Sequence, residues 1–183
     1  IKSKRKKDKV HMHIIKYIIF LLVLTSSSYI GILVSKKYKN RVRELKEMKS
    51  SLAIFATKIK LTYEPIPEIF LEIGNKENSD VKSINNIFKV AAKKMEELPA
   101  GKAWIEALES QNTNLKKEDI EVLKGLSNLL GKVDVEGQVS EIELVDNFLN
   151  TQIEKAEEES KKSEKMYKVL GVTIGLAMVI VLV

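Results

Sequence analysis

Apolar residues along this chain form two long runs near its ends and shorter periodic stripes between them. The runs cover 14–34 and 167–183, and the second carries no charged residue from Val169 onward. A helix rises about 1.5 Å per residue, so about 20 apolar residues cross a hydrocarbon core of about 30 Å. The first run has this full length, and the second is slightly shorter. We therefore expect transmembrane helices at 14–34 and 167–183.

Each run has an alternative interpretation. A cleaved signal peptide would need a small-residue cleavage site after 14–34, but this run passes directly into Lys36 and Lys37. A buried helix of a soluble domain is the alternative for 167–183, although an uninterrupted apolar run favours the membrane. Gly171 and Gly175 lie four residues apart in this run and would let another helix approach closely. They are the candidate residues for packing within the membrane.

Between the runs, apolar residues recur at steps of three and four, the pattern of amphipathic helices. One stripe, over 42–59, continues the first run without a break. Prolines and glycines interrupt the stripes at 65–67, at 98–101 and at Gly131, where we expect the fifth helix to end. No β-hairpin pattern is present. The prediction is an all-α fold, a bundle of about six helices at 35–166 between an N-terminal and a C-terminal transmembrane helix.

The charge distribution predicts an orientation. The formal net charge is +6, from 31 Lys and Arg against 25 Asp and Glu. Basic residues flank the inner side of both runs, which by the positive-inside rule puts the middle domain in the cytoplasm. These residues are Lys36, Lys37, Lys39, Arg41, Arg43 and Lys46 after the first run, and Lys161, Lys162, Lys165 and Lys168 before the second. Such clusters indicate contact with anionic lipid, so we expect the membrane as a partner and no nucleic acid.

The N-terminal segment, 1–13, is basic as well and opposes this orientation. The chain begins with Ile1, and Met12 falls just before the first apolar run, where a natural start would lie. Our hypothesis is that residues 1–11 are non-native or an upstream extension. The charge asymmetry that defines the orientation is then clear.

The sequence offers little for catalysis. It contains no cysteine, which excludes disulfides, thiol catalysis and thiolate metal sites. His11 and His13 lie outside the middle domain, and no glycine-rich phosphate loop occurs. Asp119, Asp134 and Glu136 are carboxylates without a partner base. We expect a non-enzymatic protein with no catalytic residue, no cofactor and no metal.

Four features follow one another in order along the chain. They are the elbow Tyr63-Glu-Pro-Ile-Pro-Glu-Ile-Phe70, Trp104, the segment Leu129-Leu-Gly-Lys-Val-Asp-Val-Glu-Gly-Gln138, and the C-terminal Met166-Tyr-Lys-Val-Leu-Gly-Val-Thr-Ile-Gly-Leu. In order and spacing they resemble the stage III sporulation protein AB family of endospore-forming bacteria, over 14–183. The elbow is similar to the family's Tyr-x-x-Thr-Pro-Leu-x-Glu-Ala-Phe element. Lys58 and Lys60 depart from the family, which commonly carries acidic residues before that element.

The resemblance implies an inner-membrane platform subunit of a transenvelope, secretion-like complex, similar to the platform proteins of type II secretion and type IV pilus systems. It implies a multi-pass protein of the mother-cell membrane around the forespore, with its central domain in the cytoplasm. The implied partners are a cytoplasmic hexameric ATPase and other subunits of the sporulation channel. The candidate partner-binding residues are Tyr63, Glu64, Glu68, Trp104, Asp134 and Gln138. The alternative is a membrane-anchored tether or signalling module that forms homodimers through Gly171 and Gly175.

Overall fold

The computed structural model of the chain describes residues 2–62, 64–76, 81–128, 130–131 and 134–182. These residues form six α-helices, one 3₁₀ helix and no strand, so the prediction of an all-α fold with about six helices is confirmed. The elements are α1 (Lys2–Leu61), α2 (Ile66–Gly74), α3 (Lys82–Lys94), α4 (Ala100–Ser110), α5 (Lys117–Gly125), η1 (Leu126–Asn128) and α6 (Val135–Leu182).

The chain divides into two units. The terminal unit contains 1–37 and 160–183, and the central unit contains 38–159, so α1 and α6 each contribute to both. Within the described part of the chain, no helix combines the length and the apolar character that a membrane span requires. The transmembrane helices at 14–34 and 167–183 therefore stay predictions.

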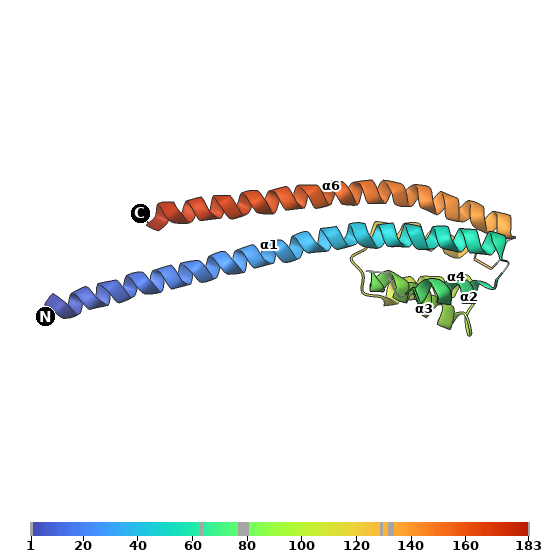
Figure 1. Cartoon of the computed structure of the whole chain (residues 1–183), viewed down its shortest axis with the longest axis horizontal. Helices are drawn as coiled ribbons and strands as arrows, with labels where there is room; N and C mark the ends of the chain where they lie inside the picture. The colour runs from blue at the N-terminus through green and yellow to red at the C-terminus, as the bar shows by residue number, and fades with distance from the viewer. Residues whose placement is uncertain (1, 63, 77–80, 129, 132–133, 183) are drawn as a thin grey trace. The chain divides into compact units, whose positions relative to one another are not determined.

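In the central unit, α1 and α6 lie side by side and run in opposite directions (Figure 1). Lys46 Nζ lies 2.6 Å from Glu157 Oε1, and Lys49 Nζ lies 3.4 Å from Asp146 Oδ2. One row of buried positions in each helix steps alternately by four and three residues, which is the repeat of a coiled coil. The rows are Arg41, Leu45, Met48, Leu52, Phe55 and Ile59 in α1, and Gln138, Ile142, Val145, Leu149, Gln152 and Ala156 in α6. Glu44, Ser51 and Ile153 are buried beside these rows.

The short helices complete the core with an aromatic cluster. Phe70 of α2 contacts Phe55 of α1 edge-to-face, with ring centroids 4.9 Å apart. Phe88 of α3 and Trp104 of α4 pack against the same ring at 5.0 and 5.6 Å. Edge-to-face contacts at these distances add to the stabilisation that burial of the rings provides. Four helices are thereby joined through four aromatic side chains.

The connections of the central unit gather at two ends. The proximal end is the one where Tyr38 and Glu159 lie, and Glu44 there contacts the first turn of α3 and the connection after α4. Ser83 Oγ donates to Glu44 Oε1 at 2.9 Å, and the main-chain nitrogen of Asn114 donates to Glu44 Oε2 at 2.6 Å. The distal end holds the other three connections, at 62–65, 95–99 and 129–134.

Two glycines of the central unit differ in the space around them. A methyl group on Gly101, in α4, would lie 2.1 Å from the carbonyl oxygen of Ser127, whereas one on Gly125 would meet only Glu141 Oε1, at 3.8 Å. We expect Gly101→Ala to destabilise the protein by about 1–3 kcal/mol, because the η1 backbone would have to move. Urea unfolding followed by the fluorescence of Trp104 measures this. Gly125→Ala is the control and should be neutral or mildly stabilising, and equal losses for both variants would contradict the prediction.

Candidate interaction surface at the distal end

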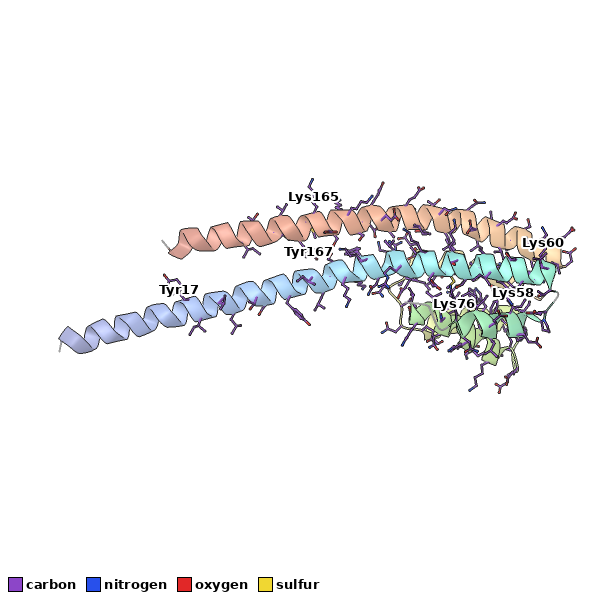
Figure 2. The ribbon with its side chains drawn as sticks, in the orientation of Figure 1. Tyr17, Lys58, Lys60, Lys76, Lys165 and Tyr167 are labelled. Carbon is purple, nitrogen blue, oxygen red and sulfur yellow. The ribbon has the colours of Figure 1, made fainter. Side chains whose placement is uncertain are left out.

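The distal end presents an acidic surface. The described charged residues in its three connections and in the first turns of α2 and α6 are carboxylates, whereas the first turn of α4, which follows the connection at 95–99, carries the exposed Lys102. Lys58 and Lys60, in the last turn of α1, border this surface (Figure 2). The carboxylates are Glu64, which is half-buried, and the exposed Glu68, Glu96, Glu97, Asp134 and Glu136. We call this set the distal carboxylates.

The elbow forms as the prolines predict. Pro65 precedes α2 and Pro67 lies in its first turn, where a missing backbone N–H costs the helix nothing, and α2 ends at Gly74 as expected. Glu68 lies in the same first turn, where a negative charge is favourable. Tyr63, the first residue predicted for this surface, lies outside the described residues.

Lys58 ties the elbow to α1. Its ammonium group contacts the carboxylate of Glu72 and lies 3.9 Å from Glu64 Oε2. The hydrogen bond with Glu72 raises the pKa of Lys58 above its ordinary value. At this position, where the resemblance leads us to expect an acidic residue, the chain has a cation that pairs with Glu72 of α2 and Glu64 of the elbow.

Asp134 and Gln138 begin α6. Asp134 Oδ1 accepts a hydrogen bond from the main-chain nitrogen of Gly137 at 2.9 Å, so Asp134 caps the helix. Its carbonyl oxygen accepts from the main-chain nitrogen of Gln138 at 3.1 Å. The Asp134 side chain is exposed, whereas Gln138 is buried in the stripe that faces the core. Only Asp134 of this pair is accessible to a partner.

Trp104 belongs to the core and not to this surface. It is fully buried, and its Nε1 donates to the carbonyl oxygen of Leu123 at 2.8 Å. The tryptophan is thus a structural residue, and the prediction that listed it with the partner-binding residues does not agree with its position. Gly171 and Gly175 lie within α6, one turn apart.

The sequence prediction left out Glu96 and Glu97. They lie in the connection between α3 and α4, directly before Pro99, and both are exposed. A run of two glutamates near a helix end is usually a solvated feature, so the sequence alone gave no reason to choose them. The connection that carries them leads into α4, and Gly101 at the start of α4 packs against Ser127 of η1. This tertiary contact brings the connection close to η1.

A second set of charges lies at the proximal end and is internal. Arg41 Nε and Nη2 donate to the two carboxylate oxygens of Asp119, both at 2.8 Å, and Nη1 donates to Glu159 Oε2 at 2.7 Å. Asp119 Oδ2 also accepts from the main-chain nitrogen of Lys116 at 2.8 Å, at the start of α5. The hydrogen bond with Asp119 raises the pKa of Arg41, against the opposing effect of burial. Asp119 is therefore occupied by structural partners.

The described residues contain no group of three or more His, Asp or Glu side chains that could hold a metal ion. The geometry of the distal end suits binding of a protein partner, because its carboxylates come from three separate connections on a rigid helical frame.

Comparison with known proteins connects this architecture to sporulation. The model of the family described as stage III sporulation protein AB matches residues 16–183. The chain belongs to this family. A relative in the family, the stage III sporulation protein AB of Bacillus subtilis (strain 168), is 26% identical over 164 residues, which cover 88% of this chain and 95% of the relative. The family that the sequence resembles is thus confirmed.

A solved structure supports the fold. The chain of stage III sporulation protein AB (SpoIIIAB) superposes with a TM-score of 0.58 at 22% identity, over 67% of this chain and 97% of the solved one. The names of these relatives describe a sporulation protein and state no reaction.

Proposed function

We propose that this sporulation protein is a non-enzymatic platform subunit, which couples a cytoplasmic hexameric ATPase to membrane components of a transenvelope complex during forespore development. The observation that carries the proposal is the continuity of two helices. α1 and α6 each run unbroken from the central unit into an apolar end segment. A displacement at the distal end can therefore be transmitted along a packed pair of helices to the membrane.

Attachment to the mother-cell membrane is supported by the surface of α1 in the terminal unit. Large apolar side chains such as Tyr17, Leu22 and Ile32 are 57, 63 and 65% exposed. Figure 2 shows Tyr17 on this part of α1. Exposed apolar surface of this kind is typical of a segment that contacts lipid or another helix. The hydroxyl groups of Thr25 and Ser26 donate to carbonyl oxygens one turn earlier, which satisfies them without water.

The cytoplasmic position of the central unit is supported by the basic residues that flank the apolar segments. The side chains of Lys36, Lys37, Lys161, Lys162 and Lys165 are exposed, as contact with anionic headgroups requires. With the proximal end toward the membrane, the distal carboxylates face the cytoplasm. Their partner would then be a basic surface of the ATPase, and other subunits of the sporulation channel would contact the terminal unit.

Charge reversal at Glu68 tests the coupling to the ATPase. Glu68→Lys should weaken binding of the full chain, in detergent micelles, to the secretion-type ATPase of the same organism by about tenfold, because an attractive charge pair becomes repulsive. Biolayer interferometry with immobilised ATPase measures the dissociation constant, and circular dichroism checks that the helices are retained.

The matched control is Glu154→Lys, which makes the same charge change at an exposed position of α6 away from the distal end. It should leave the dissociation constant unchanged. Equal binding of wild type and Glu68→Lys would remove the elbow from the interface, and absence of ATPase binding by the wild type would refute the platform proposal.

A further inference from the structure

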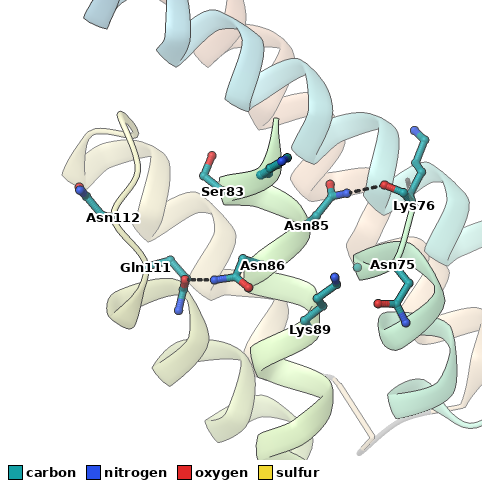
Figure 3. Close-up of a pocket in the computed structure, with 10 residues that line it drawn as sticks. Asn75, Lys76, Ser83, Asn85, Asn86, Lys89, Gln111 and Asn112 are labelled. Atoms are coloured by element: carbon teal, nitrogen blue, oxygen red, sulfur yellow. Dashed lines mark hydrogen bonds between the residues drawn. The ribbon is translucent and has the colours of Figure 1, made fainter. Parts of the chain in front are cut away.

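A polar pocket opens at the proximal end of the central unit (Figure 3). Its volume is about 600 Å³, within the range of pockets that bind small molecules. It is formed by the end of α2, the first turns of α3 and the connection after α4. Among the residues that the structure describes, its lining contains three lysines, Lys76, Lys82 and Lys89, and five carboxamide side chains, but no carboxylate. This composition favours an anion that also carries hydrogen-bonding groups.

Two of the three lysines have their charge available. Lys82 and Lys89 are exposed, and neither forms an ion pair with any residue that the structure describes. Lys76 lies at the rim, with its Nζ 3.4 Å from Glu47 Oε1. Within the described part of the chain, the lysine charges of the pocket that no carboxylate pairs therefore come from α3.

The start of α3 adds to the positive potential. The residue before the helix, Val81, has a hydrocarbon side chain and cannot accept hydrogen bonds from the amide groups of the first turn. Lys82 and Ser83 of this turn both line the pocket. The exposed amide groups and dipole of a helix N-terminus favour an anion such as a phosphate.

Asn85 supplies an independent sign that the pocket binds a ligand. Its side chain lines the pocket although the residue is only 7% exposed. Nδ2 donates to the carbonyl oxygen of Lys76 at 3.1 Å, whereas Oδ1 has no hydrogen-bond partner in the described part of the chain (Figure 3). A buried acceptor without a donor is costly, so a ligand hydroxyl that donates to Oδ1 would be favoured there.

We infer that this pocket binds a phosphate ester whose alcohol carries a free hydroxyl group, with the phosphate on Lys82, Lys89 and the start of α3 and the hydroxyl on Asn85. Soluble glycerol phosphate and the headgroup of phosphatidylglycerol share this chemistry. The lipid headgroup could reach the pocket, because the pocket lies at the end where α1 and α6 leave the central unit. Binding of the lipid, unlike binding of soluble glycerol phosphate, rests on the proposed membrane attachment.

The test uses the full chain in micelles of an uncharged detergent and two probes. Isothermal titration calorimetry measures binding of glycerol phosphate, with inorganic phosphate for comparison. Native mass spectrometry measures which lipid is retained from an equal mixture of phosphatidylglycerol and phosphatidylcholine. The variant Lys82→Gln/Lys89→Gln should weaken binding of whichever probe binds by at least tenfold. The control Lys93→Gln/Lys102→Gln, exposed lysines outside the pocket, removes the same charge and should bind as the wild type.

Binding of glycerol phosphate that is tighter than that of inorganic phosphate, or selective retention of phosphatidylglycerol, supports the inference and identifies the source. The inference is overturned if neither probe binds, if inorganic phosphate binds as tightly as glycerol phosphate, or if both lysine pairs have the same effect. No ATPase is present in these measurements. A negative result would therefore not bear on the platform proposal, which the Glu68→Lys binding experiment tests.

Discussion

Replacing Arg41 with methionine is expected to lower the free energy of unfolding by about 3–5 kcal/mol, the cost typical of removing one partner of a buried ion pair. The side chains of Arg41 and Asp119 are 3% and 0% exposed, and two hydrogen bonds of 2.8 Å join them. Without the guanidinium group, the Asp119 carboxylate stays buried beside an apolar side chain. Its remaining hydrogen bond, from the main-chain nitrogen of Lys116, does not balance the charge.

The double variant Arg41→Met/Asp119→Asn separates the charge effect from the loss of packing. Asparagine keeps an oxygen that can accept from the Lys116 amide but carries no charge, so the double variant should recover most of the loss. Urea unfolding of the full chain in micelles, followed by Trp104 fluorescence, gives both values. A loss below about 1 kcal/mol for Arg41→Met would mean that water reaches the Asp119 carboxylate, contrary to its burial.

Arg41 also marks the limit of what the sequence reveals. We assigned it to the basic flank of the first apolar run, but it is buried. Its partner Asp119 is 78 residues away, and nothing in either local sequence connects them. By contrast, the stripe predicted from Val42 to Ile59 is local and is buried from Leu45 onward, with Val42 half-buried, because burial of one helix face leaves a regular pattern of apolar residues.

The fifth helix illustrates the same limit at shorter range. The apolar stripe predicts a helix that continues to Gly131, but α5 ends at Gly125 and a 3₁₀ turn, η1, follows. The backbone tightens where Ser127 packs against Gly101 of α4, a tertiary contact that periodicity cannot show. The predicted break in the chain at Gly131 does agree with the structure, because Gly131 has φ +72°, a conformation that favours glycine.

The distal end could be predicted in part. Proline positions identify the elbow, and Asp134 is recognisable as a helix cap, so both were chosen from the sequence. That the elbow and the start of α6 lie at the same end requires the antiparallel pairing of α1 and α6, which the pairs Lys46–Glu157 and Lys49–Asp146 show together. The contribution of the connection with Glu96 and Glu97 depends in turn on how α4 packs against η1.

Truncation of Trp104 to alanine should cost about 3–5 kcal/mol, the range for deleting a large aromatic side chain from a core. The indole is fully buried and its ring contacts Phe70 and Phe88 at centroid distances of 5.6 and 5.4 Å. Trp104→Phe should cost about 1–3 kcal/mol, because it keeps an aromatic ring but loses part of the buried indole and its hydrogen bond to the Leu123 carbonyl oxygen, which still accepts from the main-chain nitrogen of Leu126. Both losses are measured by urea unfolding followed by circular dichroism, since the fluorophore is removed.

Phe148→Ala is the matched control for this pair. Phe148 lies on α6 and is 53% exposed, so its removal should change the free energy of unfolding by less than about 0.5 kcal/mol. The loss in free energy of unfolding should therefore be largest for Trp104→Ala, smaller for Trp104→Phe and smallest for Phe148→Ala, as burial and hydrogen bonding together predict. If Trp104→Phe instead matched the wild type while weakening ATPase binding, Trp104 would contribute to partner binding after all, and the central unit would have to open its aromatic core to engage the partner.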